Sequence, residues 1–516
     1  MHRFRSRIAT AGAGLAAVAV ALFAGAPSAT AAPVGYSVTA DPISAAAGWL
    51  AGQFSNSAHH PAPDGDHFES VFQGTFYPSY GENADVIFGL AAAKAGATKI
   101  DTALAYLSGN ADAYGDITNS DGFGPYDGSV AKLALAAIVA GADPTSFGGF
   151  DLMATLAKDE CPTGSTACTP GQPANIFSST SEFFVILAEA RTGGQSAPTA
   201  TALAYLSSLQ CSSGGFTGGT AACGSGAADL DATSYAIMAL QAVGGTAAQA
   251  EIDKAVAWLK QRQAAAGYWV SQGIPNVNST GLAVAALQGQ GADVTKARAW
   301  LLAQQVRAGV AGAGALKYAG TLSPTTTSAT SPSVLATAQG LLGLVDGASL
   351  ATVTAAGASA GVGVFAPRAK LSGSTVRAGA TQTATANGFA PGERVRVTIH
   401  SAPVTVATVT ASPIGSVQAR YRVPTAVGAG SHTVTLTGLT SGLTADRALT
   451  VTVASGPSTA PGGSAGGATG EPPAGAGGVI AATGQDSRRI ALMSGTGLIA
   501  VLVGGALLVV GRRREP

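Results

Sequence analysis

The sequence predicts an all-α double ring of helices, an (α/α)6 toroid, followed by a β-sandwich, a disordered stalk and one transmembrane helix. Three observations predict this order. Between about residues 40 and 355, half-exposed helical segments alternate with segments that are apolar on every side. From 366 to 454 the apolar period becomes two. The chain then ends in a Gly/Pro/Ser-rich segment and a long apolar run.

The helical region contains two kinds of segment that alternate along the chain. Half-exposed segments lie near 43–54, 99–110, 150–158, 199–210, 251–263 and 295–305. Segments that are apolar nearly all round lie near 83–95, 128–141, 180–191, 231–243, 278–289 and 332–344. A helix that is apolar on every side is buried on every side. The alternation therefore predicts an inner ring of helices wrapped by an outer ring.

A sequence repeat marks the half-exposed segments. Its copies read Lys254-Ala255-x-x-Trp258-Leu259-x-x-x-Gln263-x-x-x-Gly267-x-Trp269 and Lys296-Ala297-x-x-Trp300-Leu301-x-x-x-Gln305-x-x-x-Gly309, with a looser copy from Ala202 to Phe216. In the copy that ends at Gly309, Ala311 stands where an aromatic residue is expected. Repeats of this length indicate stacked supersecondary units. We expect the aromatic residue to pack between helices and the Gln to hydrogen-bond open backbone groups.

This pattern resembles the Gln-Trp repeat of squalene cyclases. The resemblance covers about 300 residues and implies the α/α toroid that these cyclases share with prenyltransferase β subunits, complement thioester domains and cobalamin carriers. It does not imply an activity, because the repeat is structural. A corrinoid ligand would follow from likeness of fold alone, and the residues themselves identify no cofactor.

The segment Asp229-Leu230-Asp231-Ala232 is the closest approach to a catalytic motif. Class II terpene cyclases carry Asp-x-Asp-Asp here, and the resemblance implies Asp231 as the acid, with Asp229 beside it. Ala232 replaces the last Asp, which removes part of the support for a strong acid. Because the other inner segments begin with Asn or Ser, we interpret Asp231 as a helix N-cap. An enzyme would need a second acid, for which Glu182 is the candidate.

Parallel inner helices would bring their N-termini, and the partial positive charge there, to one mouth of the ring. The residues expected to rim or approach that mouth are Tyr80, Glu82, Asp85, Tyr126, Asp127, Glu182, Asp229, Asp231, Asn276 and Asn278, and Tyr235 of an inner segment is a further candidate binding residue. They can be caps and turn residues, or a polar mouth that selects a small ligand. Both interpretations stay open at this stage.

The charge and the residue types of the chain argue against nucleic acid and metal ions as ligands. The formal net charge is zero and 11% of residues are charged, so there is no electrostatic case for nucleic acid. His59, His60 and His67 share a polar loop with Asp64 and Asp66 but lack a recognisable metal spacing. We therefore expect no metal site.

Four cysteines stand at 161, 168, 211 and 223. An even count in an exported chain predicts disulfides. The simplest of the three possible connectivities pairs Cys161 with Cys168 and Cys211 with Cys223.

The region 366–454 resembles an Ig-like β-sandwich, because Val395, Val397 and Ile399 alternate with polar residues and similar runs recur at turn-bounded intervals. Residues 455–479 are rich in Gly, Pro and Ser and are expected to be a disordered linker.

Both ends of the chain contain segments typical of targeting signals. Residues 1–31 have the charged start, apolar stretch and small-residue cleavage site of a secretory signal peptide. The end, 480–516, runs from Ile480-Ala481-Ala482-Thr483-Gly484 into an apolar segment, 490–511, and then three arginines. This order resembles the cell-wall sorting signal of Gram-positive surface proteins, in the variant of actinobacteria. It implies that a sortase cuts between Thr483 and Gly484 and joins Thr483 to peptidoglycan. The alternative is a plain single-span membrane anchor, and either places the protein outside the cell.

The leading hypothesis is thus an extracellular, wall-anchored protein whose toroid binds a small ligand or a surface partner without catalysis. A degenerate cyclase-like or glycan-active enzyme that uses Asp231 is one alternative. A structural adhesin, with a plugged ring and binding through the Ig-like module, is the other.

Overall fold

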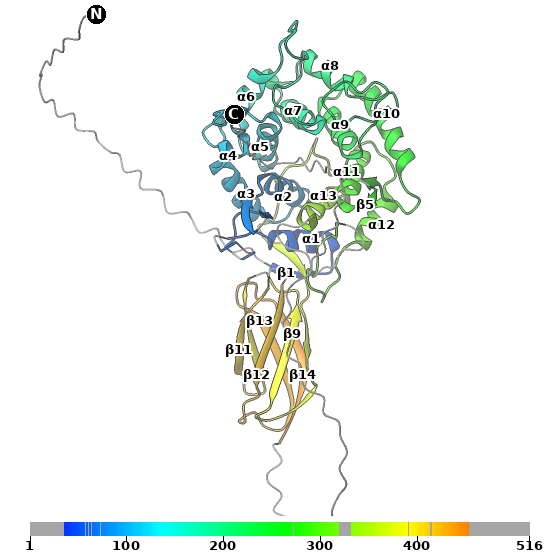
Figure 1. The fold of residues 1–516 in the computed structure, drawn as a ribbon. Coiled ribbons are helices and arrows are strands. Elements are labelled where there is room, and N and C mark those ends of the chain that lie inside the picture. Colours follow the sequence, from blue (N-terminus) through cyan, green and yellow to red (C-terminus); the bar gives the residue numbers. More distant parts are fainter. Residues whose placement is uncertain are drawn as a thin grey trace, which may run out of the picture.

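The computed structural model describes residues 36–453, except 57, 60, 63, 73, 272, 319–331, 391 and 413–414. A ring of helices stands on an elongated β domain (Figure 1). The expected signal peptide, linker, sorting signal and apolar run 490–511 lie outside the described residues. Within the described part of the chain, no helix is long and apolar enough to span a membrane.

In that part of the chain, six helices form the inner ring. They are α2 (Tyr80–Ala92), α5 (Asp127–Ala140), α7 (Ser179–Thr192), α9 (Leu230–Val243), α11 (Val277–Gln288) and α13 (Pro332–Leu344). Each helix packs on the next in this order, and α13 packs on α2, which closes the ring (Figure 1). The predicted helical ring is therefore confirmed.

The outer ring is made by the helices that alternate with these. They are α1 (Pro42–Ala51), α3 (Ala97–Gly109), α6 (Leu152–Asp159), α8 (Ala200–Ser208), α10 (Gly245–Arg262) and α12 (Thr295–Ala303). Short elements not predicted by the periodicity lie between them: α4 (Ala111–Gly115), η1 (Pro144–Ser146) and η2 (Gly194–Ser196). Helix α10 has the expected amphipathic pattern, since Trp258 and Leu259 are buried while Lys260 is exposed.

Glycines let the inner helices approach closely. A Cβ atom at Gly281 of α11 would lie 2.4 Å from the Gln339 carbonyl oxygen of α13, and one at Gly89 of α2 would lie 2.8 Å from the Ala338 carbonyl oxygen. Neither distance is compatible with a side chain. The abundant Gly of the sequence is therefore used partly for helix contacts.

The repeat performs the structural role expected of it. The amide nitrogens of Gln210 and Gln263 donate to the carbonyl oxygens of Gly214 and Gly267, each at 3.0 Å. The following aromatic side chains, those of Phe216 and Trp269, are buried. The Gln hydrogen bonds to open backbone groups are thus confirmed.

The third copy differs from the expected alignment. Gln305 donates to Gly314 at 3.0 Å rather than to Gly309, across nine positions instead of four. Gly314 has φ 100°, close to the 101° of Gly267, whereas Gly309 has φ 75°. Buried Leu316, not Ala311, therefore takes the place of the aromatic residue. Because the loop of the third copy is longer, the spacing in the sequence placed Gly309 and Ala311 where Gly314 and Leu316 lie in the structure. Gln305 also donates to the Pro42 carbonyl of α1 at 2.7 Å, which joins the last repeat to the first.

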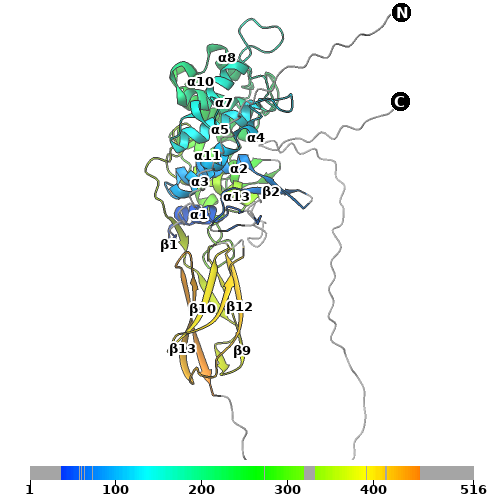
Figure 2. The same cartoon turned by 90° about the vertical axis from the view of Figure 1, so that its left-hand side faces the viewer.

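Two short hairpins precede inner helices. Strands β2 (Glu69–Phe72) and β3 (Thr75–Pro78) come before α2, and β4 (Val270–Ser271) and β5 (Ile274–Pro275) come before α11. The β2–β3 hairpin projects from one face of the ring (Figure 2).

Within its described residues, the β domain has one three-stranded and one five-stranded sheet, ordered β12-β9-β7 and β11-β10-β13-β14-β8. The strands are β7 (Arg368–Leu371), β8 (Thr375–Arg377), β9 (Thr381–Asn387), β10 (Arg394–His400), β11 (Val404–Thr410), β12 (Ser416–Arg422), β13 (Gly430–Gly438) and β14 (Thr444–Thr452). Both sheets contribute to one apolar core, to which Val395, Val397 and Ile399 of β10 belong. The predicted period of two is therefore correct there.

Two links tie the β domain to the ring. Strand β1 (Tyr36–Thr39), which precedes the helices, pairs in parallel with β6 (Val362–Phe365), which follows them, and Tyr36 and Val364 of this pair pack against the apolar core of the β domain. The Asn387 side chain also donates to the Gly309 carbonyl oxygen at 3.2 Å. The ring is thus fixed to the β domain near its own two chain ends.

Candidate functional site

The inner helices run parallel, so the ring has two chemically different ends. Gly128 lies against Ser181 near the starts of α5 and α7, and Gln241 donates to Ala286 at 2.9 Å near the ends of α9 and α11. We call the end where α2, α5, α7, α9 and α11 begin the N-terminal mouth. The opposite end, where they finish, is the C-terminal mouth.

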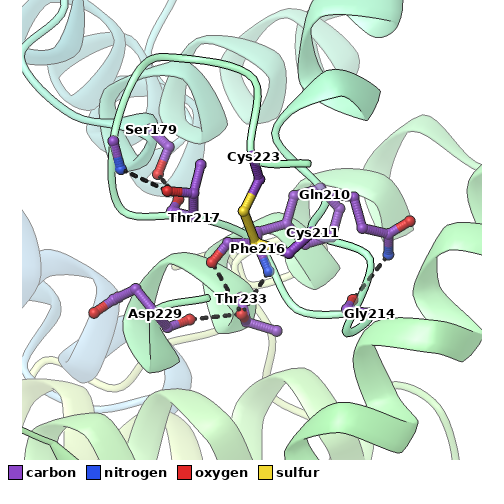
Figure 3. The surroundings of a disulfide bond; sticks show 10 residues. Ser179, Gln210, Cys211, Gly214, Phe216, Thr217, Cys223, Asp229 and Thr233 are labelled. Atoms are coloured by element: carbon purple, nitrogen blue, oxygen red, sulfur yellow. Dashed lines mark hydrogen bonds between the residues drawn. A yellow bond between two sulfur atoms is a disulfide. The ribbon is translucent and has the colours of Figure 1, made fainter. Parts of the chain in front are cut away.

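At the N-terminal mouth, the N-cap of α9 lies two residues earlier than the sequence indicated. Asp229, not Asp231, is its N-cap and accepts a hydrogen bond from the Ala232 amide at 2.8 Å. Thr233 ties the preceding loop to the helix, because its hydroxyl accepts from Phe216 N at 2.9 Å and donates to the Asp229 carbonyl at 2.6 Å (Figure 3). The interpretation of Asp231 as the N-cap is therefore wrong. Both Asp positions could cap by sequence, and only backbone geometry distinguishes them.

Asp231 lies instead in the first turn of α9. Its Oδ1 atom is buried and has no hydrogen-bond partner among the described residues. Burial raises the pKa of Asp231 to about 6, with the Ser279 hydroxyl opposing the rise and Asp229 adding to it.

The neighbouring helix α11 repeats this arrangement. Asn276 is buried and caps it by accepting from the Ser279 amide at 2.8 Å. Asn278 lies in the first turn, where its buried Oδ1 has no partner in the described part of the chain. The two predicted Asn residues thus reach the mouth, but one of them is occupied as a cap.

Four predicted acids share a position in the first turn of an inner helix: Glu82, Asp127, Glu182 and Asp231. Burial raises the pKa of Glu82 to about 8, that of Asp127 to about 7 and that of Glu182 well above its usual range. The positive ends of the helices favour the ionised form of a carboxyl group, but here burial outweighs them.

Glu182 and Asp231 lie in the first turns of adjacent inner helices. Burial and the charges of Glu189, Glu160 and Asp127 raise the pKa of Glu182, whereas burial and Asp229 raise that of Asp231. Like Asp231 Oδ1, both carboxyl oxygens of Glu182 are buried without a hydrogen-bond partner among the described residues.

The centre of the ring holds a buried ion pair. The Lys132 ammonium of α5 lies 2.8 Å from the Asp85 carboxylate of α2, and the two side chains are 2% and 4% exposed. Around it, the Phe184 ring lies 5.4 Å from the ammonium and 5.0 Å from the Tyr235 ring. Tyr235 is buried, and its hydroxyl accepts from the Gln339 amide at 3.2 Å. Asp85 and Tyr235 thus fill the interior rather than rim a mouth.

Lys132 and Gln339 were missed by sequence reasoning. A lone lysine in the apolar segment 128–141 could have signalled the pair, because a buried charge requires a partner.

The other two predicted tyrosines, Tyr80 and Tyr126, belong to the outer parts of this face. Tyr80 packs against Tyr114 and Tyr106 of α4 and α3, with ring centroids 5.4 and 6.0 Å away. The Tyr126 hydroxyl donates to Asp121, and its ring lies 6.0 Å from that of Phe177. Tyr126 therefore belongs to the loops that surround the mouth.

Four aromatic side chains in the segments before inner helices are exposed. Phe123 and Phe177 are 74% and 64% exposed, and Phe76 and Tyr77 on β3 are 40% and 43% exposed. Among the large apolar residues that the structure describes as exposed, these four are all the aromatic ones. Each precedes an inner helix, so all four lie on the face of the N-terminal mouth.

Disulfides and hydrogen bonds hold the loops of this face in place. Cys161 pairs with Cys168 before α7, and Cys211 pairs with Cys223 before α9 (Figure 3), which confirms the predicted connectivity. In the loop before α5, the Asp116 carboxylate accepts from the Ser120 amide at 2.8 Å, and Asp121 accepts from the Phe123 amide at 2.8 Å. The exposed rings are thus held on ordered loops.

The polar loop near the start of the chain forms carboxylate contacts. Glu69 lies 2.8 Å from the ring of His59 and 3.1 Å from that of His67. Among the residues covered by the structure, no group of three or more His, Cys, Asp or Glu side chains is placed to hold a metal ion.

No family model matches the chain, and no curated protein is similar to it. Among solved structures, it is similar to the type II terpene cyclase MstE from Scytonema, with a TM-score of 0.41 and 18% identity over 59% of this chain and 96% of that one. It is also similar to the unsaturated glucuronyl hydrolase from Bacillus sp. GL1, with a TM-score of 0.36 and 11% identity over 52% and 85%. No activity is carried over from either likeness.

Proposed function

We propose that this is an extracellular binding protein that holds an extended, uncharged saccharide chain against the N-terminal mouth without catalysis. The observation that carries the proposal is the exposure of Phe76, Tyr77, Phe123 and Phe177, which all precede inner helices on the side of this mouth. Large exposed apolar side chains on one face are typical of interaction sites. Flat rings on ordered loops suit the apolar C–H faces of sugar rings, and they lose little conformational entropy on binding.

The charge of the face supports a saccharide without negative charge. The segments 69–78, 116–126, 161–178, 211–229 and 270–275 contain no Lys or Arg. They do contain Asp116, Asp121 and Asp229, whose carboxylates accept hydrogen bonds. Hydroxyl-rich chains would be accepted, and anionic polymers would be repelled.

The filled ring centre supports binding at the surface rather than inside. A reactive cavity on the ring axis would have to displace the Asp85–Lys132 pair and its neighbours Phe184 and Tyr235. Removing one member of a buried pair strands the other charge. A long ligand that crosses the mouth requires no such change.

We further propose that the chain is displayed at the cell surface. A signal peptide at 1–31 would export it, and a sortase would join Thr483 to peptidoglycan after cutting before Gly484. The two disulfides fit an oxidising compartment. Mass spectrometry of wall fragments released by a muramidase tests this, because a peptide ending at Thr483 and linked to a wall peptide is expected. A product that retains residues 484–516 would instead indicate a single-span anchor.

Co-sedimentation with insoluble polysaccharide tests the binding face. We expect the full chain to bind cellulose or chitin and to bind an anionic polysaccharide less well. Replacing Phe123 and Phe177 together by Ser should weaken binding about tenfold, since each ring contact contributes about 0.5–1.5 kcal/mol. The matched control replaces exposed Val453 by Ser on the β domain. Unchanged binding by the double variant would contradict the proposal and would favour an adhesin that binds through its β domain.

Asp231 favours one second candidate, an acid-dependent enzyme. Its pKa of about 6 and its unpartnered Oδ1 are properties of a general acid. Turnover of a polysaccharide or isoprenoid by the purified chain, abolished by Asp231→Asn with an unchanged melting temperature, would establish it. Asp229→Asn is the control, because Asn also serves as an N-cap.

A further inference from the structure

The C-terminal mouth contains a hollow that the sequence did not indicate. Its volume is about 290 Å³, and it lies between the ends of α9 and α11, the start of α10 and the segment that follows α13. Leu240 and Ile252 form its apolar wall. Its polar lining comes from Gln241, Gln249, Gln290, Ser349 and Thr352.

We propose that this hollow binds a small, uncharged, polyhydroxylated molecule the size of a monosaccharide or cyclic polyol. Ligand pockets commonly measure about 300–1,000 Å³, so the hollow matches the small end of the range. Its lining contains no charged side chain. Amide and hydroxyl groups both donate and accept hydrogen bonds, as sugar hydroxyls do. The site lies opposite the proposed saccharide face and does not depend on it.

The amides are fixed before a ligand arrives. The Gln241 amide donates to the Ala286 carbonyl at 2.9 Å and accepts from the Ser349 hydroxyl at 2.9 Å. Gln249 donates to the Gln290 oxygen at 3.0 Å and to the carboxylate of Asp253, one turn further along α10, at 2.8 Å. Within the described residues, this leaves Gln290 Nε2 and Gln249 Oε1 as a donor and an acceptor without protein partners. A preorganised pair of this kind lowers the entropy cost of binding.

The helix ends and the lining of the hollow favour a ligand without charge. Helices α9 and α11 end at this mouth, where carbonyl oxygens present partial negative charge. Helix α10 begins at the same hollow and brings the opposite partial charge, so the helix ends present both donors and acceptors. An anion would find no cationic side chain in the lining to pair with, so a neutral ligand is favoured. Gly244 and Gly245 have positive φ, and a Cβ atom on either would meet nothing within 4 Å. Glycine at these positions keeps the entrance open.

Calorimetric titration of the full chain tests the site with D-glucose, N-acetylglucosamine and myo-inositol, and with D-glucuronate as the anionic probe. We expect at least one neutral probe to bind, and glucuronate to bind at least tenfold more weakly than glucose. Gln290→Leu, which keeps the size of the side chain but removes the amide, should weaken binding about tenfold. Gln261→Leu on the exposed face of α10 should change nothing.

Three results would overturn the proposal: no binding of any neutral probe, equal binding of glucuronate and glucose, or unchanged binding by Gln290→Leu. The melting temperature of Gln290→Leu shows whether the variant is folded. Should it unfold, Gln249→Leu removes the acceptor instead and must weaken binding. The Phe123/Phe177 double variant should bind the small probes normally, which separates a failure here from a failure of the saccharide face.

Discussion

The two mouths of the ring differ because an α-helix leaves N–H groups without hydrogen bonds at its start and C=O groups without them at its end. Open backbone N–H groups at the start require acceptors, and Asp229, Asn276 and the first-turn acids collect there. At the other end, glycines follow α5, α7 and α9, where Gly141, Gly193 and Gly244 adopt φ of 84°, 68° and 71°. One mouth is thus titratable, and the lining of the hollow at the other is neutral. Because the inner helices run parallel, their starts lie together at one mouth and their ends at the other, which gives two chemically distinct surfaces.

The largest predicted effect concerns the ion pair that closes the ring between the mouths. Lys132→Met should lower the free energy of unfolding by about 3–5 kcal/mol, because it leaves the Asp85 carboxylate buried and unpaired. Urea denaturation of the full chain measures it. Adding Asp85→Leu should recover most of the loss, since no buried charge then remains. A single variant as stable as the parent would show that water reaches Asp85 and that the centre is open.

The second prediction tests whether the N-terminal mouth depends on its pinned loops. Replacing both Cys211 and Cys223 by Ser should cost about 2–3 kcal/mol, because the unfolded chain gains the freedom of this loop. Hydrogen exchange should then rise in residues 211–229 and stay unchanged around Gly289 and Gln290. Faster exchange at both mouths would mean that the ring transmits the change and that the two surfaces are not independent.

Much of this fold could be predicted from sequence because it depends on local patterns. Periodicity places the helices, and the Gln263 and Gly267 spacing identifies the repeat. Errors arose where a choice depends on atoms distant in sequence. Asp229 and Asp231 are both good caps, and a longer loop moved the third repeat from Gly309 to Gly314.

The candidate sites were harder to predict than the fold. Residue types suggested the polar N-terminal mouth. Lys132 in an apolar segment indicates a buried charge, but its partner Asp85 lies 47 residues away and no local pattern identifies it. The exposure of Phe123 depends on loop hydrogen bonds. Gly244, Gly245, Gly289 and Gly347 line the hollow at the C-terminal mouth, and glycine carries no functional group that could mark a site in the sequence.

The third prediction concerns how the buried acids of the N-terminal mouth make the stability of the protein depend on pH. Glu82 has a folded pKa of about 8, raised from 4.5 mainly by burial, and burial raises the pKa of Glu182 as well. Below pH about 4.5 both carboxyl groups are protonated in the folded and in the unfolded protein. The contribution of their raised pKa values to stability is then fully present. As the pH rises to 8, the unfolded state releases its protons first and stability falls.

Denaturant unfolding at a series of pH values measures this trend. Glu182→Gln should flatten it and make the protein more stable than the parent at pH 8, because a neutral amide needs neither a proton nor a buried charge at this position. Asp101→Asn on the exposed face of α3 is the control and should leave the slope unchanged. A stability that rises over this range would mean that the four acids are solvated in the folded protein.

The smallest predicted effect is an absence of pH dependence at the C-terminal mouth. Asp231, Asp127 and Glu82 have pKa values of about 6, 7 and 8, so the N-terminal mouth gains negative charge across this range. No titratable side chain lines the opposite hollow. Binding of a neutral probe there should therefore change less than about twofold between pH 6 and pH 8, measured by calorimetry at constant ionic strength. Saccharide binding to the N-terminal mouth should vary more, since its acids change from donors to acceptors. Equal pH dependence at both mouths would show that charge at one end is felt at the other, and that the closed centre does not insulate them.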